Sequence, residues 1–120
     1  MRLIVMPALL LALAAPAQAQ TYPIQGRWGQ STSLEKGPID CVGKRVIAFL
    51  GNQRTDSNGG VPSYRNQSVT PEGPSSYRIV DEFSTGQISA GHTSYILRQV
   101  DADHIEMIME GSALKLQRCK

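Results

Sequence analysis

The stretch that decides the fold is residues 93–119, TSYILRQVDADHIEMIMEGSALKLQRC. Two of its segments alternate, with Ile105, Met107 and Met109 on one face of the first and Leu114, Leu116 and Arg118 on one face of the second. A period of two residues is typical of a strand with one buried face. Short turns join the segments at residues 101–103 and 111–112. Turns this short connect antiparallel neighbours, so the stretch predicts a three-stranded meander over residues 93–100, 104–110 and 113–119.

The rest of the chain continues the β pattern. Strand candidates occur at residues 26–32, 44–50 and 76–83, with weaker ones at residues 62–69 and 87–90. No window after residue 19 shows a convincing helical period. Six to eight short strands indicate an all-β fold, either a small antiparallel up-and-down barrel or a small sandwich, and a closed barrel also removes unpaired edges.

Two polar segments are predicted to be loops. Residues 52–60 end in Asn58-Gly59-Gly60, and residues 70–75 read TPEGPS. Asn-Gly pairs and prolines favour turns. Because proline has no N–H to donate, Pro71 and Pro74 are not expected in a central strand.

Residues 1–19 have the three parts of a secretory signal: basic Arg2, an apolar run over residues 3–15 and the A-x-A site Ala17-Gln18-Ala19. A transmembrane helix is the alternative, but a bilayer core takes about 20 apolar residues. We therefore expect a cleaved signal peptide over residues 1–19, a single domain over residues 20–120, and a periplasmic or secreted bacterial protein.

The charge balance narrows the range of partners. Twelve Lys and Arg face ten Asp and Glu, and 41% of the residues are hydrophobic. A nearly neutral surface attracts neither nucleic acid nor anionic lipid strongly. We expect no nucleic-acid partner, no stable membrane anchor and a monomer.

The two cysteines, Cys41 and Cys119, both follow the signal. Lone thiols usually pair in an oxidising compartment. A bridge closing so long a loop stabilises the fold by about 4 kcal/mol in the chain-entropy model. A catalytic thiol is the alternative, but the sequence has no Cys-x-x-Cys motif, so we expect a disulfide.

The first and last strands carry a matching pair of residues. Gly26-Arg27-Trp28 opens the first strand and contains the only tryptophan, while Arg118 lies on the last. If Arg118 faces inward, its charge needs compensation. Stacking on an aromatic ring stabilises such a cation by about 0.5–2 kcal/mol. In a closed barrel the first and last strands are neighbours, so we expect Trp28 and Arg118 to stack.

With these residues the chain resembles the lipocalin and calycin superfamily of up-and-down β-barrels. In those families a Gly-x-Trp near the first strand packs against an Arg from the last. The chain looks most like the periplasmic metalloprotease-inhibitor barrels of Gram-negative bacteria, which are also exported and place a cysteine after the Gly-x-Trp, as Cys41 is placed here. In that family the second cysteine lies early, whereas here it is Cys119.

Catalytic constellations are hard to find. The sequence has no G-x-S-x-G elbow, phosphate-binding loop, dinucleotide fingerprint or zinc spacing. Asp101, Asp103 and His104 offer three metal ligands, but a solvated turn is the favoured interpretation. Asp81 and Glu82 point to opposite faces of a strand and cannot share a proton. We expect no enzyme activity, no metal and no cofactor.

Three functions remain open: a binding module that inhibits an extracytoplasmic hydrolase such as a metalloprotease, a carrier of a small apolar ligand, and a structural envelope protein. The resemblance implies an N-terminal arm that enters the enzyme's cleft. It would consist of Gln20, Thr21, Tyr22, Pro23 and Ile24. The alternative is that these residues are a frayed terminus. The loops at residues 52–60 and 70–75 are a second candidate contact surface.

Overall fold

The computed structural model describes residues 21–120, and its regular elements are all β-strands. The expectations for residues 1–19 and for Gln20 lie outside the described residues. Between Thr21 and Lys120 we find no helix with the length and apolar character needed to cross a membrane.

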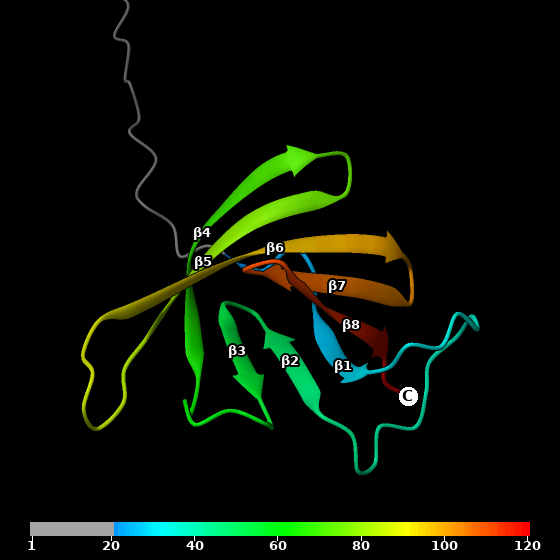
Figure 1. Cartoon of the computed structure of the whole chain (residues 1–120), viewed down its shortest axis with the longest axis horizontal. Coiled ribbons are helices and arrows are strands. Elements are labelled where there is room, and N and C mark those ends of the chain that lie inside the picture. Colours follow the sequence, from blue (N-terminus) through cyan, green and yellow to red (C-terminus); the bar gives the residue numbers. More distant parts are fainter. Residues whose placement is uncertain (1–20) are drawn as a thin grey trace, which may run out of the picture.

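Eight antiparallel strands follow one another in chain order around a closed barrel, and the first pairs with the last. This confirms the predicted all-β up-and-down barrel and excludes the sandwich. The strands are β1 (Gly26–Gln30), β2 (Val46–Leu50), β3 (Gln53–Asp56), β4 (Tyr64–Gly73), β5 (Ser76–Phe83), β6 (Gly91–Asp101), β7 (His104–Met109) and β8 (Ser112–Arg118). In Figure 1 the short strands β1–β3 lie in the lower half of the view, the β4–β5 hairpin reaches the top, and β8 runs down beside β1 to close the barrel.

The alternation that predicted the meander also places the core. Ile105, Met107 and Leu116 are buried, and in the β7–β8 ladder Ile105 is the partner of Leu116 and Met107 that of Leu114. Since alternate side chains of a strand point to opposite faces, one face of each strand lines the interior. The buried cluster draws on both walls of the barrel, with β2 giving Ile47 and Phe49.

Three sequence expectations are wrong. The segment at residues 52–60 is not all loop, because β3 occupies Gln53–Asp56. The strand before β5 runs through Pro71 to Gly73 instead of ending at residue 69. Beyond Arg65 the β3–β4 ladder stops, so Pro71 pairs only with Tyr77 of β5 and its missing N–H costs no central ladder bond. Residues 87–90 form no strand.

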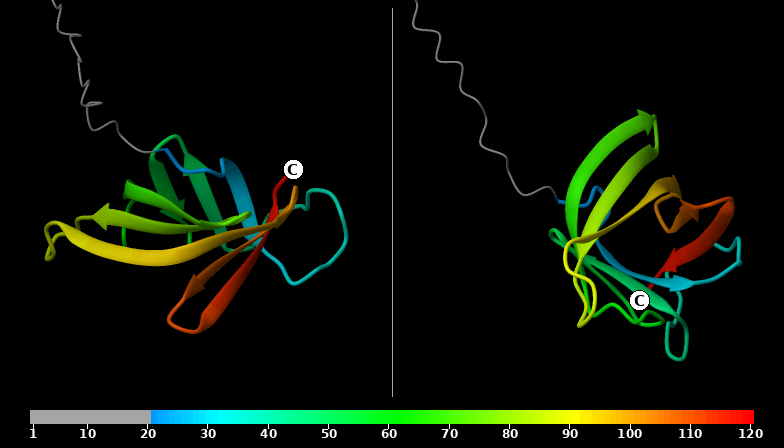
Figure 2. Two further views of the ribbon diagram at one scale, coloured as in Figure 1. Left: turned by 90° about the horizontal axis from the view of Figure 1, so that it is seen from above. Right: turned by 60° about the vertical axis from the view of Figure 1, so that its left-hand side comes forward.

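The connection between β1 and β2, residues 31–45 (the β1–β2 loop), is the longest in the barrel. Figure 2 shows this loop standing out from the barrel beside the end of β8. It carries Cys41 and returns to the barrel through Arg45, whose guanidinium forms two hydrogen bonds with Asp56.

Candidate functional site

The barrel interior is filled by its own side chains. Trp28, Phe49, Arg54 and Tyr95, its largest residues, are each at most 2% exposed. An internal cavity large enough for a ligand would leave part of this surface accessible to water. The middle of the barrel is therefore packed, as protein interiors generally are.

A buried ion pair lies among these side chains. The Nε of Arg54 donates to Oδ2 of Asp81 at 2.8 Å, and the Tyr95 hydroxyl donates to the same oxygen at 2.9 Å. Asn66 donates to the other oxygen at 3.3 Å, and the Arg54 guanidinium lies 3.8 Å from the centre of the Tyr64 ring. The side chains of Arg54 and Asp81 are 2% and 0% exposed, so neither charged group is solvated by bulk water. Sequence reasoning missed Arg54, because a lone arginine in a polar segment is normally solvated.

The N-terminal segment does not form a free arm. Tyr22 and Ile24 are only 3% and 4% exposed, and the Tyr22 ring packs edge-on against Phe49 at 5.0 Å. The backbone N–H of Tyr22 donates to Gly51, and Gln25 holds the same turn through its side chain. The expectation that residues 20–24 are available to enter an enzyme's cleft is therefore wrong for Tyr22 and Ile24, whose apolar surface fills the barrel. Thr21 and Pro23 are exposed, and Gln20 is outside the described residues.

Burial raises the pKa of the Tyr22 and Tyr95 hydroxyls far above that of an exposed tyrosine, and the charge of Asp81 adds to this effect. The two hydroxyls differ in their partners. Tyr95 donates to Asp81, whereas the Tyr22 hydroxyl has no hydrogen-bond partner among residues 21–120. A buried hydroxyl without a partner lowers stability.

Trp28 and Arg118 meet where β1 and β8 close the barrel. They are direct partners in the β1–β8 ladder, and the guanidinium carbon of Arg118 lies 4.4 Å from the centre of the Trp28 ring. Gly26 lies beside both, since a methyl group at its Cα would sit 3.6 Å from Arg118. The guanidinium also donates to the carbonyl of Ala102 in the β6–β7 turn. Through these contacts Arg118 connects β1, β8 and the β6–β7 turn.

A disulfide joins Cys41 to Cys119, with 5.6 Å between the Cα atoms, as predicted. It ties the β1–β2 loop to the residue after β8. Gln117 holds the same loop from the outer face of β8: its amide donates to the carbonyls of Glu35 and Gly37 and accepts from the Ser31 hydroxyl, each at 2.9 Å. Gln117 is 0% exposed because the loop covers it. The loop is thus attached at several points along its length.

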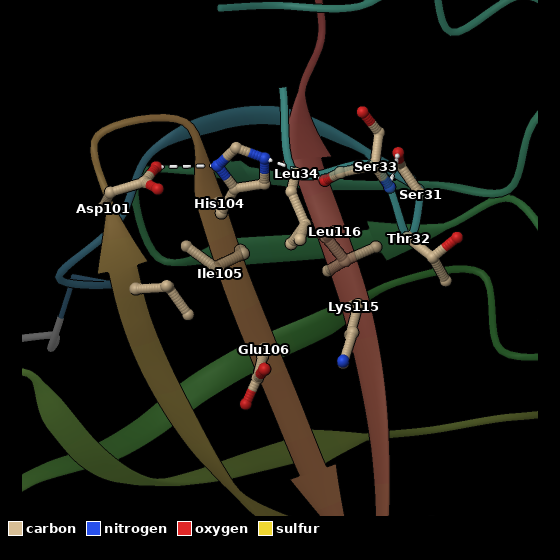
Figure 3. Close-up of a pocket in the computed structure, with 11 residues that line it drawn as sticks. Ser31, Thr32, Ser33, Leu34, Asp101, His104, Ile105, Glu106, Lys115 and Leu116 are labelled. Carbon is tan, nitrogen blue, oxygen red and sulfur yellow. Dashed lines mark hydrogen bonds and ion pairs between the residues drawn. The ribbon is translucent and has the colours of Figure 1, made fainter. Parts of the chain in front are cut away.

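A shallow groove lies between the start of this loop and the β6–β7 turn (Figure 3). Leu34 and Val100 are its exposed apolar residues, and the buried side chains of Ile105 and Leu116 lie beneath it. At one end His104 bridges Asp101 and the carbonyl of Ser33, at 2.8 and 3.1 Å (Figure 3). With a volume of about 90 Å³ the groove is too small to enclose an organic ligand.

The β1–β2 loop also presents apolar side chains to solvent. Leu34 is 90% exposed and Val42 is 87% exposed, more than any other large hydrophobic residue in the described chain. Neither contributes to the barrel core, and both sit on backbone that the disulfide and Gln117 hold in place. The loop therefore carries the two most exposed large apolar side chains of residues 21–120.

The remaining sequence candidates, Asp81, Glu82, Asp103 and His104, all contact other residues of the chain. Asp81 points into the barrel and its neighbour Glu82 pairs with Arg65 on the outside. Asp103 accepts from the backbone of Gly37, and His104 is engaged with Asp101. Across residues 21–120 no three His, Cys, Asp or Glu side chains are grouped closely enough to hold a metal ion.

Comparison of the chain with protein-family models, with curated proteins and with solved structures gave no match.

Proposed function

We propose that the chain is an exported binding module that contacts a protein partner through its β1–β2 loop. The observation that carries the proposal is the contrast between a filled barrel and a tethered loop with Leu34 and Val42 exposed. A rigid loop loses little conformational entropy when it binds, so its apolar side chains contribute more fully to affinity. The disulfide fits a protein that matures in an oxidising compartment.

Inhibition of an extracytoplasmic hydrolase, such as a metalloprotease, is the specific form of binding that we propose. The resemblance of the Gly26–Trp28 start and Arg118 to the periplasmic inhibitor barrels supports it. Because Tyr22 and Ile24 are buried, the inhibitory contact is assigned to the β1–β2 loop and not to the N-terminal segment. A carrier of small apolar ligands is disfavoured by the packing of the barrel interior.

The test compares a loop variant with a matched surface variant. Leu34→Ser/Val42→Ser removes the exposed apolar groups of the loop, and Leu50→Ser removes another large apolar side chain, 61% exposed, at the end of β2. Each protein is titrated against the metalloproteases secreted by its own source organism. We expect stoichiometric inhibition by the wild type and by Leu50→Ser, with at least a tenfold weaker effect for the loop variant. No inhibition at micromolar excess would exclude the inhibitor proposal. Equal inhibition by the loop variant would exclude this loop as the contact.

A further inference from the structure

Both ring nitrogens of His104 face hydrogen-bond acceptors. Nδ1 lies 2.8 Å from Oδ1 of Asp101, and Nε2 lies 3.1 Å from the backbone carbonyl oxygen of Ser33 (Figure 3). The His104 side chain is only 13% exposed, so water has limited access to replace either contact. The two acceptors come from opposite sides of the groove: Asp101 ends β6, and Ser33 belongs to the β1–β2 loop.

A neutral imidazole cannot satisfy this arrangement. It carries a single N–H, so one of its two nitrogens must meet an acceptor with a lone pair. The imidazolium has two N–H groups and donates to both Asp101 and Ser33. Hydrogen bonding to His104 also lowers the pKa of the Asp101 carboxyl, which keeps the partner of the ring negatively charged.

The other two carboxylates near His104, those of Asp103 and Glu106, already have partners. Asp103 accepts from the backbone N–H of Gly37 and lies 3.6 Å from Arg118. Glu106, on β7, pairs with Arg98 at 2.9 Å. Lys115, on β8, lines the same groove and supplies its positive charge. Asp101 is therefore the carboxylate that accompanies the charge of the ring.

We propose that His104 is a proton-dependent clamp on the β1–β2 loop, closed when its ring carries two protons and open at Ser33 when it carries one. Loss of the second proton leaves the remaining N–H on the charged Asp101, the stronger acceptor, and places a lone pair opposite the Ser33 carbonyl. The contact with Ser33 is therefore present when the ring is an imidazolium and lost when the ring is neutral.

The clamp acts next to the most exposed apolar residue of the loop. Ser33 precedes Leu34, whereas the following part of the loop stays attached through Gln117 and the disulfide. Because Gln117 also holds the Ser31 hydroxyl, opening is confined to residues 32–34. Regulation of partner binding by this clamp rests on the proposed function, whereas the clamp itself rests only on the contacts of His104.

Hydrogen exchange and NMR spectroscopy of the oxidised protein test the clamp without any partner. Between pH 5.5 and 8, after correction for intrinsic exchange, we expect protection at residues 33–35 to fall about threefold to tenfold, the change expected for losing one hydrogen bond. The Leu34 methyl signals should shift with the same midpoint as the His104 ring signals. Unchanged protection and Leu34 shifts across the His104 titration would overturn the proposal.

Two variants distinguish the effect of His104 on the loop from that of His92. His104→Gln keeps a permanent N–H donor near Ser33 and should make the loop insensitive to pH. His92→Gln alters the other histidine, which is 47% exposed beside Glu82, and should leave the wild-type pH response intact. A pH response that persists in His104→Gln, or disappears in His92→Gln, would also contradict the clamp. A lack of protease inhibition would contradict only the proposed function, and a lack of pH response at residues 33–35 would contradict only the clamp. The two results can therefore be told apart.

Discussion

Arg118 stacks on Trp28 across the junction of the first and last strands, and the two residues are also direct partners in that ladder. Trp28 is 0% exposed, and its indole N–H donates to the carbonyl of Gln25 at 3.2 Å. The guanidinium of Arg118 therefore covers the indole ring of Trp28, which is buried in the barrel. The stack fixes which residue of β8 lies opposite which residue of β1.

Trp28→Ala is expected to lower the free energy of unfolding by about 3–5 kcal/mol, as deletions of large buried aromatic residues do. Since Trp28 is the only tryptophan, its fluorescence reports on this junction alone. The native emission should be blue-shifted, and Arg118→Met, which keeps an apolar stem, should change its intensity without unfolding the protein. Emission typical of a solvated indole in the native protein would contradict the burial of Trp28.

The buried pair Arg54–Asp81 should show strong coupling. Arg54→Met or Asp81→Asn alone leaves a buried group without its partner, and each is expected to cost about 3–5 kcal/mol. The double variant should cost clearly less than the sum of the two. A double-mutant cycle measured by urea denaturation checks this, and simple additivity would mean that the two charges do not interact.

Two tyrosine-to-phenylalanine variants should act in opposite directions. Tyr95→Phe removes the hydroxyl that donates to Asp81 at 2.9 Å and should destabilise the barrel by about 1–3 kcal/mol. Tyr22→Phe removes a buried hydroxyl that has no partner in the described part of the chain, and it should stabilise the barrel by about 1 kcal/mol. Thermal unfolding of both variants under identical conditions provides the measurement. Equal destabilisation would mean that the Tyr22 hydroxyl is hydrogen-bonded in solution.

Alkaline pH should unfold the protein through the same two tyrosines. Because burial raises the pKa of both hydroxyls in the folded state, the unfolded chain releases their protons first. Their contribution to stability is complete below about pH 10, the ordinary tyrosine value, and is lost as the pH rises above it. Tyrosinate absorbance should therefore show two of the four tyrosines titrating only together with unfolding. Four independent titrations in the folded protein would contradict this.

Gly29→Ala should strain the contact with the disulfide. A methyl group at this position would lie 2.5 Å from Sγ of Cys41, well inside van der Waals contact. Overpacking of this kind costs about 1–3 kcal/mol. Gly60→Ala is the control, because a methyl group there meets nothing within 4 Å. Equal melting temperatures for the two variants would show that the bridge can move away from β1.

The sequence predicted the elements whose alternation reflects burial. The strand predicted at residues 104–110 is β7 (His104–Met109), because the inward positions of that strand are apolar. β3 was missed for the opposite reason: its buried side chain is Arg54, whose burial depends on Asp81 from a distant strand. Burial of Gln117 could not be predicted either, since it faces outward and is covered only because the β1–β2 loop folds back over β8. Single-strand patterns do not encode such long-range coverage.

The closure of the barrel has a consequence for how chains associate. Seven of the eight ladders join strands that follow one another in sequence, while the β1–β8 ladder joins the first to the last. Until that ladder forms, β1 and β8 both have open edges, and the β1 of one chain can pair with the β8 of another. The bridge between Cys41 and Cys119, 78 positions apart, removes this option, because it holds both edges within one chain. We therefore expect the bridge to favour pairing of β8 with its own β1, and reduction to make exchange of β1 or β8 between two chains easier.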